Sequence, residues 1–320
     1  MKNDKIKFLV WSINYSLFGK YMKKDGVDVE AIYKGSENRL ISVCRVLWFK
    51  MNLPKHVWFN NKNKGMQGKV VIFGDMVGKE YLDWLVANNP DAKIIFLYWD
   101  PIVLARIDID TVKKAGCEVW SYGDEQCKEY NIKQNLPFYC NSMYEEARKS
   151  AGIKEYDIIF SGKDKGRLGY LESLMKEPYW KDLKWNLYIS PDHFWQIFKK
   201  KIYKKFLPYD KLLCKQAASK AVLELVPSSL KETTMRTIDA MCLHQKLITN
   251  NTNIVSMNYY DGNNIFVMGR DRAEDLKDFI EGPFHPIPEE VWNELSLEKW
   301  VERFVLDEPV NKIQDCFHST

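Results

Sequence analysis

The sequence of 320 residues lacks the short motifs that mark several common classes of protein. No Gly-x-x-x-x-Gly-Lys-Ser/Thr segment occurs, which excludes a P-loop nucleotide site, and no Gly-x-Ser-x-Gly turn supports a serine hydrolase. No stretch approaches the roughly 20 apolar residues of a membrane span. The apolar run around Phe8–Trp11 is far shorter than the hydrophobic region of a signal peptide. We therefore expect a cytoplasmic protein.

Cysteine is scattered along the chain without a recognisable pattern. The seven cysteines include no Cys-x-x-Cys pair and no Cys/His spacing typical of a metal site. Dispersed thiols fit a reducing compartment better than a disulfide framework, and we expect neither a metal nor another cofactor. The 47 basic and 43 acidic residues leave a net charge of +4, which is too balanced to indicate a nucleic-acid-binding protein.

Short apolar stretches alternate with amphipathic segments along most of the chain. Strands are predicted at Lys69–Phe73 and Lys93–Trp99 in the first half, and at Tyr156–Phe160 and Lys246–Thr249 in the second. Helical spacing lies between such strands, as in Arg39–Lys50. Apolar strands that alternate with helices favour parallel sheets covered on both faces. We predict an α/β protein with two Rossmann-like doubly wound domains that face each other across a cleft.

The division into domains follows from a polar interval in the middle of the chain. The segment Tyr122–Lys154 has no clear periodicity and contains Asn135-Leu136-Pro137, so we place the junction there. The prediction is an N-terminal domain over 1–150, a C-terminal domain over 151–290, and a helical tail over 291–320 that packs back on the first domain. Ligands of doubly wound folds bind outside the carboxyl ends of the strands, and we look for site residues there.

The stretch Leu225–Asn251 is the strongest candidate for a site. Ser229 followed by Glu232 is a capping-box spacing, so a helix should begin there, directly after the strand Ala221–Val226. A helix that follows a strand directs backbone N–H groups and the positive end of its dipole to the sheet edge. The alternative is that Glu232 only caps the helix and that its charged neighbours pair along one face. Polar side chains around the predicted anion site are Thr233, Thr234 and Arg236.

A second charged turn follows the strand that ends at Phe160. Gly162 and Gly166 permit the backbone to approach a ligand closely. Lys165 and Arg167 offer positive charge to a diphosphate. A solvated turn is the alternative for a loop of this composition.

Four segments in the second half resemble one known family. In order they are Ile158–Leu168 (IIFSGKDKGRL), Thr233–Met241 (TTMRTIDAM), Lys246–Asn251 (KLITNN) and Tyr259–Met268 (YYDGNNIFVM). They resemble the donor-binding domain of nucleotide-sugar glycosyltransferases with the glycosyltransferase B (GT-B) architecture. The resemblance is greatest to the bacterial enzymes that assemble capsule, exopolysaccharide and lipopolysaccharide core. It covers about Tyr156–Met268, and it extends to the first half only through the βα pattern.

The resemblance implies a transferase that moves a sugar from a nucleotide-diphosphate sugar to a growing, lipid-linked surface glycan. It implies that Asp239 meets the nucleoside and that the first half forms the acceptor side. No metal is required, because cationic side chains and a helix dipole can neutralise the diphosphate. The Asp108-Ile109-Asp110 triplet precedes a helix, and we interpret its likeness to a metal-binding DxD motif as chance. The residues implied to bind the donor are Gly162, Lys165, Arg167, Thr233, Thr234, Arg236 and Asp239.

Two aspartates of the first half are the candidates for a catalytic base. Asp75 and Asp100 each follow a predicted strand, and an inverting transferase needs a carboxylate or histidine within reach of the acceptor hydroxyl. The alternative for an aspartate in this position is a turn or a helix cap. A non-catalytic, two-lobed module that binds nucleotides or sugars would need no base, and this function remains open as the second candidate.

A basic run within Phe198–Phe206 (FKKKIYKKF) is the last feature. One interpretation is a solvated loop, and the other is contact with an anionic membrane surface. The second interpretation would suit a lipid-linked acceptor and would place the protein at the inner face of the cell membrane. The cationic side chains of the run are Lys199, Lys200, Lys201, Lys204 and Lys205.

Overall fold

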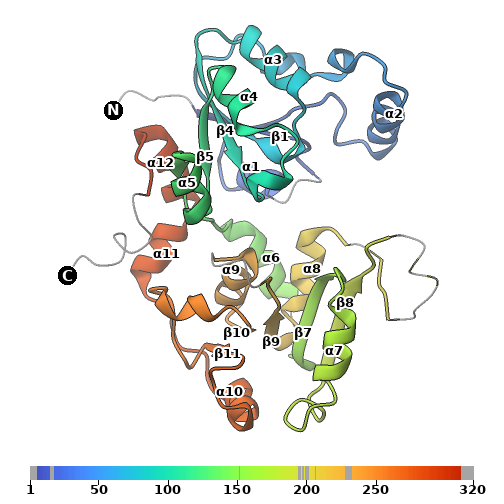
Figure 1. Ribbon diagram of the computed structural model, residues 1–320, viewed down its shortest axis with the longest axis vertical. Coiled ribbons are helices and arrows are strands. Elements are labelled where there is room, and N and C mark those ends of the chain that lie inside the picture. The colour runs from blue at the N-terminus through green and yellow to red at the C-terminus, as the bar shows by residue number, and fades with distance from the viewer. Residues whose placement is uncertain are drawn as a thin grey trace. The chain divides into compact units, whose positions relative to one another are not determined.

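The computed structural model describes residues 6–14, 18–150, 152–193, 196, 198, 202–205, 207–227 and 233–310, with Asp75 described by its backbone alone. The chain divides into two compact units, Met1–Cys140 together with Asn293–Thr320, and Asn141–Trp292. Each unit contains one parallel β-sheet with helices (Figure 1). The predicted α/β class, with a parallel sheet in each half of the chain, is therefore confirmed.

The sheet of the first unit has six parallel strands in the order β2-β1-β3-β4-β5-β6. Its central strands are almost wholly apolar because both of their faces are buried, as is typical of parallel sheets. β1 pairs with β2 on one side and with β3 on the other, so the strand order reverses between β1 and β3. The strands are β1 (Ile6–Val10), β2 (Val29–Ala31), β3 (Gly68–Phe73), β4 (Ala92–Tyr98), β5 (Glu118–Ser121) and β6 (Lys133–Gln134).

Helices cover both faces of this first sheet. On one face Phe96 packs into a core cluster with residues of α3 and α4. On the other face the ring centroid of Phe8 lies 5.2 Å from that of Trp300 and 6.0 Å from that of Phe304, both in α12. The last helix of the described chain is therefore part of this core. The helices of the unit are α1 (Gly19–Lys24), α2 (Arg39–Lys50), α3 (Lys79–Ala87), α4 (Ile109–Lys114), α5 (Asp124–Tyr130) and α12 (Leu297–Leu306).

Polar contacts fasten α12 to the first sheet. The ammonium group of Lys69 in β3 donates to the backbone oxygens of Phe304 and Val305 at 2.9 and 2.8 Å. Asp307, which ends α12 in the left-handed conformation, pairs with Lys93 at 3.1 Å and with Lys133 at 2.5 Å. These contacts join the C-terminal helix to β3, β4 and β6.

The sheet of the second unit has five parallel strands in the order β11-β10-β9-β7-β8. Along β7, Ile158 and Phe160 pack in one cluster with residues of α7 and α10, whereas Ile159 is buried on the opposite face. β7 pairs with both β8 and β9, so the strand order reverses between β7 and β9. The strands are β7 (Tyr156–Lys163), β8 (Trp185–Ser190), β9 (Ser219–Glu224), β10 (Lys246–Thr249) and β11 (Ile265–Val267). The helices are α6 (Asn141–Ser150), α7 (Leu168–Leu174), α8 (Tyr209–Gln216), α9 (Met235–Cys242) and α10 (Leu276–Glu281), and α11 (Glu289–Leu295) spans the division between the units.

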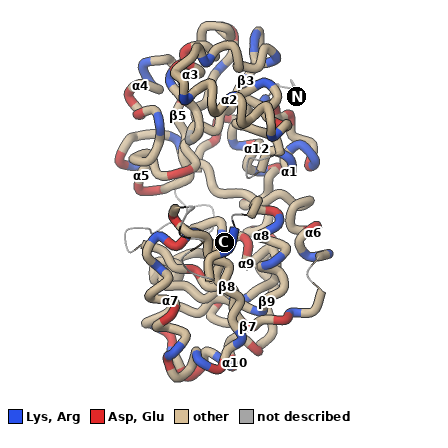
Figure 2. The backbone as a smooth tube through the Cα atoms, turned by 90° about the vertical axis from the view of Figure 1, so that its right-hand side faces the viewer, with Lys and Arg blue, Asp and Glu red and all other residues tan. Residues whose placement is uncertain are grey.

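The expected irregular interval Tyr122–Lys154 is wrong, because it contains α5, β6 and α6. Its periodicity is weak because β6 has only two residues and because α6 exposes charged side chains over a small buried face that includes Tyr144 and Ala147. The units divide after Cys140, before α6, whereas the expected boundary was residue 150. No helix in the described ranges is long and apolar enough to cross a membrane. Basic and acidic residues are intermingled along both units (Figure 2).

Candidate functional site

The candidate site lies where the second sheet reverses its strand order. β7 and β9 are neighbours there, with Ile158 opposite Ala221. In open α/β sheets, ligands bind outside the carboxyl ends of the strands at such a reversal. The turn between β7 and α7 and the residues after β9 both belong to this edge. The two charged segments singled out in the sequence therefore meet at one edge of one sheet.

Arg236 connects the first turn of α9 to the end of β7. Its Nη1 donates a hydrogen bond to the backbone oxygen of Ser161 at 2.6 Å. Its Nε is buried and has no hydrogen-bond partner among the described residues. The hydroxyl of Ser161, a residue that is 1% exposed, likewise lacks a described partner. Buried polar atoms are normally hydrogen-bonded, so this pair of orphaned atoms marks a place where a further polar group fits.

Arg167 is held just before α7 by backbone carbonyl groups. Its Nε donates to the oxygen of Asp164 and its Nη1 to the oxygen of Leu225, each at 3.1 Å, and its Nη2 donates to the oxygen of Lys163. The guanidinium also lies over the ring of Phe160, 5.1 Å from the centroid. Because Leu225 follows β9, the side chain ties the turn after β7 to the end of its neighbour.

The two arginines bring two positive charges close together, and Asp164, Asp192 and Asp239 lie near enough to interact with one or the other. Burial lowers the pKa of Arg167, and the nearby charge of Arg236 lowers it further. Asp164 is close, but its carboxylate accepts hydrogen bonds from the N–H of Leu168 at 2.8 Å and from the hydroxyl of Tyr203 at 2.5 Å. Neither arginine forms an ion pair with an acidic residue in the part of the chain that the structure describes. An anion bound here would relieve the repulsion between the two groups.

The predicted threonines lie at the start of α9. Thr234 is the N-cap residue, whose hydroxyl oxygen accepts from the N–H of Arg236 at 3.1 Å. The same hydroxyl donates to the carboxylate of Glu224, which also accepts from Thr249 at 2.6 Å. The hydroxyl of Thr233 lies 2.5 Å from that of Tyr259. The predicted helix start at Ser229–Glu232 lies outside the described residues, and the described helix begins at Met235.

The glycine–lysine turn is more exposed than the arginines. Gly162 lies beside the guanidinium of Arg167, since a Cβ atom added to it would lie 3.4 Å from Nη2, at van der Waals contact. Lys165 has a φ of 46°, and its N–H donates to both carboxylate oxygens of Asp192 at 3.1 Å. The Lys165 side chain is exposed at the same edge of the sheet.

Asp239 lies among helices rather than at the strand ends. It is 2% exposed, and its carboxylate accepts from the hydroxyl of Tyr144 in α6 at 2.8 Å and from that of Tyr209 in α8 at 2.5 and 2.6 Å. Burial raises the pKa of Asp239 to about 6, although the hydrogen bonds from the two tyrosines lower it. The predicted contact with a nucleoside requires an oxygen that these tyrosines occupy here.

Sequence reasoning missed two residues of this edge. Ser161 gave no signal beyond its place at the end of a strand. Glu224 could have been recognised, because it is the one charged residue in the apolar run Ala221–Val226. A carboxylate that is 3% exposed needs donors, and the threonines of α9 and β10 supply them.

The proposed bases lie in the first unit, after adjacent strands. β3 and β4 pair with Phe73 opposite Leu97, so the residues that follow them share the carboxyl edge of that sheet. Asp100 is exposed there. Asp75 lies in a short 3-10 helix, Gly74–Met76, and its side chain is outside the described residues.

The remaining candidates from the sequence are the basic run near β8 and the Asp108-Ile109-Asp110 triplet. Lys204 and Lys205 are exposed beside β8, whereas Lys199, Lys200 and Lys201 lie outside the described residues. Asp108 is the N-cap of α4, accepting from the N–H of Thr111 at 2.8 Å, which agrees with its interpretation as a helix start. The described residues contain no group of three or more His, Cys, Asp or Glu side chains that could hold a metal ion.

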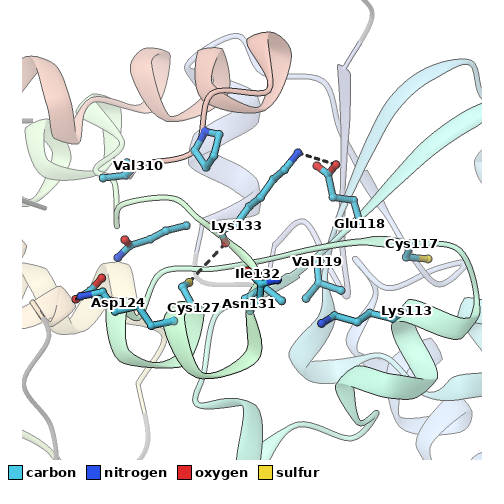
Figure 3. A pocket seen from close by; sticks show the side chains of 13 residues that line it. Lys113, Cys117, Glu118, Val119, Asp124, Cys127, Asn131, Ile132, Lys133 and Val310 are labelled. Atoms are coloured by element: carbon cyan, nitrogen blue, oxygen red, sulfur yellow. Dashed lines mark hydrogen bonds and ion pairs between the residues drawn. The ribbon is translucent and has the colours of Figure 1, made fainter. Parts of the chain in front are cut away.

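A cavity of about 520 Å³ lies in the first unit, away from every predicted site residue (Figure 3). Glu118 and Lys133 in its wall form an ion pair at 2.9 Å, and the thiol of Cys127 lies 3.5 Å from the backbone oxygen of Lys133. Asp124 pairs with Lys128, and Lys113 donates to the backbone oxygen of Tyr130, so these charged groups already have partners in the protein. We assign no ligand to it.

No protein-family model matches the chain, and no curated protein matches it. Among solved structures, the chain is similar to Anabaena Alr3699/HepE. The structure of that protein in complex with UDP-glucose shares 10% identity, covering 86% of this chain and 88% of that chain with a TM-score of 0.43. Its complex with UDP also shares 10% identity, covering 87% and 89% with a TM-score of 0.45. Identity and TM-score are both too low for a conclusion about the function of this chain.

Proposed function

We propose that this protein is a glycosyltransferase that binds a nucleotide-diphosphate sugar at the carboxyl ends of β7 and β9. The observation that carries the proposal is the pair of neighbouring guanidinium groups, Arg167 and Arg236, which have no ion-pair partner among the described residues. They stand at the reversal of strand order, where α/β sheets bind nucleotides. The segments that resemble the donor-binding domain of glycosyltransferases contain both arginines.

The site would act by neutralising the negative charge of the departing nucleoside diphosphate. When the sugar leaves, the nucleoside diphosphate gains negative charge, and fixed positive groups lower the barrier most if they are in place beforehand. Carbonyl groups already orient Arg167, and the backbone of Ser161 orients Arg236. The N-terminus of α9, capped by Thr234, adds its dipole. Lys165 would supply a mobile charge at the rim.

The finer parts of the proposal rest on the resemblance. They are the GT-B architecture, an acceptor that is a growing lipid-linked surface glycan, and a base in the first unit, either Asp75 or Asp100. A contact of Asp239 with the nucleoside also stays a prediction. It requires Tyr209, the more exposed of its two hydroxyl partners, to release the carboxylate.

The test begins with ligand-induced thermal stabilisation by UDP, GDP and TDP, each compared with its nucleoside. We expect one diphosphate to raise the melting temperature well beyond its nucleoside, because a ligand that binds only the folded state stabilises it. If no diphosphate does so, the proposal is wrong. Incubating the protein with sugar derivatives of the stabilising nucleotide then separates the two candidate functions. Release of the sugar, slowly to water, is expected of a transferase, whereas a binding module leaves the donor intact.

A further inference from the structure

Helix α2 presents its apolar stripe to solvent rather than to the core. Leu40, Val43, Leu47 and Met51 recur at helical spacing along and just beyond the helix, and they are 77%, 49%, 52% and 62% exposed. A helix on the surface of a globular protein normally buries such a stripe. Figure 1 shows α2 at the outer side of its unit, away from the sheet.

The opposite side of α2 packs against the protein through an arginine and an aromatic side chain. Arg45 is 4% exposed, its guanidinium lies 4.6 Å from the ring centroid of Tyr33, and its Nη1 has no hydrogen-bond partner among the described residues. Phe49 also faces Tyr33, with ring centroids 5.6 Å apart. The indole N–H of Trp48 donates to the backbone oxygen of Pro54 at 3.0 Å. Specific contacts therefore hold the helix with an arginine inward and four apolar side chains outward.

The segment that carries this stripe is rich in basic residues. The segment 34–64 contains one acidic residue, Glu37, against six basic ones besides the inward-facing Arg45. Two acids from outside the segment contact it, Glu80 at 3.1 Å from Lys55 and Glu30 at 3.8 Å from Lys62, which still leaves an excess of positive charge. These six basic residues are Lys34, Arg39, Lys50, Lys55, Lys62 and Lys64, of which Arg39 and Lys50 belong to α2 itself.

We infer that the outer face of α2 is a docking surface for an anionic lipid bilayer. An exposed apolar stripe bordered by lysine and arginine is the pattern of helices that lie in the bilayer interface, with apolar side chains among the acyl chains and cations at the headgroups. With 12 residues, α2 is far too short to span a bilayer, for which about 20 are needed, so it would lie along the surface. This inference does not depend on the proposed function, and it concerns residues distinct from the basic run near β8.

The test is sedimentation of the full-length protein with vesicles of phosphatidylcholine, with and without phosphatidylglycerol. We expect binding to the anionic vesicles, weakened by salt, and about tenfold or greater loss of binding in Leu40→Ser/Leu47→Ser, since each buried leucine contributes strongly to transfer from water. Both positions are exposed, so the double variant keeps the fold. The matched control is Val103→Ser/Leu104→Ser, which removes exposed apolar side chains elsewhere in the same unit and should bind like wild type. Equal binding by both double variants would overturn the inference.

Cys44 offers a direct readout because it is exposed on the same side of α2. An environment-sensitive fluorophore attached there, in a variant with Cys214 and Cys316 replaced by serine, should shift to the blue on adding phosphatidylglycerol vesicles. The same label at Lys114→Cys in a Cys44→Ser background should not respond. No shift at Cys44 contradicts the inference. A shift at Cys44 that grows with protein concentration without vesicles also contradicts it, and assigns the face to contact between copies of the chain.

Discussion

The guanidinium of Arg236 donates to the backbone oxygen of Ser161 over 2.6 Å, and this one bond fixes the charge of α9 at the end of β7. A single hydrogen bond uses few of the five donors of a guanidinium, and the buried Nε has no described partner. Arg236 is therefore oriented yet still able to bind an anion. Arg167 differs, because three backbone carbonyl groups already occupy it. We expect Arg236 to contribute most to the affinity for the ligand. We expect Arg167 to contribute most to the stability of the turn between β7 and α7.

That difference predicts opposite outcomes for the two arginines in stability. Arg167→Met should lower the free energy of unfolding by about 1–3 kcal/mol, because it leaves partly buried carbonyl groups without a donor. Arg236→Met should cost less, and it should even stabilise the free protein if it removes the repulsion between the guanidinium groups. Urea unfolding of both variants measures this. The prediction is wrong if Arg236→Met is the more destabilised variant.

Glu224 is predicted to hold the N-terminus of α9 against β10. Its carboxylate accepts from Thr234 and Thr249, so Glu224→Ala leaves one half-buried and one buried hydroxyl group without their acceptor. We expect a loss of about 2 kcal/mol or more in the free energy of unfolding, and weaker diphosphate binding. Glu281→Ala is the control, because it removes an exposed glutamate that pairs with Lys220. Equal stability of the two variants would contradict the assignment.

Asp239 predicts a pH dependence of stability. Its pKa in the folded protein is raised to about 6, above the ordinary value of 3.8, because burial favours the neutral acid. The stabilisation that the neutral Asp239 side chain gives the folded state relative to the unfolded state is therefore fully present below about pH 4. It is lost as the pH rises through about 6. This difference between the pKa of Asp239 in the folded and in the unfolded protein corresponds to about 3 kcal/mol in the free energy of unfolding. The unfolding free energy of wild type relative to Asp239→Asn should fall by up to that amount from pH 4 to pH 7.

The matched control for this titration is Asp83→Asn, an exposed acid in α3 that pairs with Lys79. Its unfolding free energy should follow the pH dependence of wild type. If Asp239→Asn follows wild type as well, Asp239 is ionised in the folded protein across this range, contrary to the prediction.

Replacement of the catalytic base should affect turnover more than donor binding. With Asp100→Asn or Asp75→Asn, we expect kcat to fall by about 100-fold or more for the residue that acts as base, with an unchanged KM for the donor. Asp91→Asn, on the opposite edge of the same sheet near the start of β4, is the control. Full turnover in both variants would remove both aspartates from the mechanism.

The sequence was sufficient to predict most strands and the sheet edge at which Arg167 and Arg236 lie. Short apolar runs such as that of β4 favour a strand in a sheet covered on both faces, and β10 has the predicted bounds. The positions of Arg167 and Arg236 followed from their places after strands. Parallel strands end at the same edge, so the two charged segments had to meet if their strands were neighbours.

Other features could not be predicted, because they depend on tertiary contacts. The hydroxyl groups that surround Asp239 come from helices 95 and 30 residues away in sequence. Helix α2 was predicted with its observed bounds, yet its apolar spacing gave no sign that this face would point to solvent. Contacts of Arg45 and Phe49 with Tyr33 accompany that orientation. Periodicity reports that a helix has an apolar side, whereas the partner of that side is a property of the fold.

The most direct test of the central claim is the affinity of Arg236→Gln for the nucleoside diphosphate that stabilises wild type, measured by calorimetry beside the nucleoside alone. We predict that the variant binds the diphosphate at least about tenfold more weakly, since a charge-assisted hydrogen bond contributes about 1.5–3 kcal/mol, and that its affinity for the nucleoside is unchanged. Arg272→Gln, an exposed arginine of the same unit that pairs with Glu274, should bind both like wild type. An Arg236→Gln variant that keeps the full preference for diphosphate over nucleoside would contradict the account.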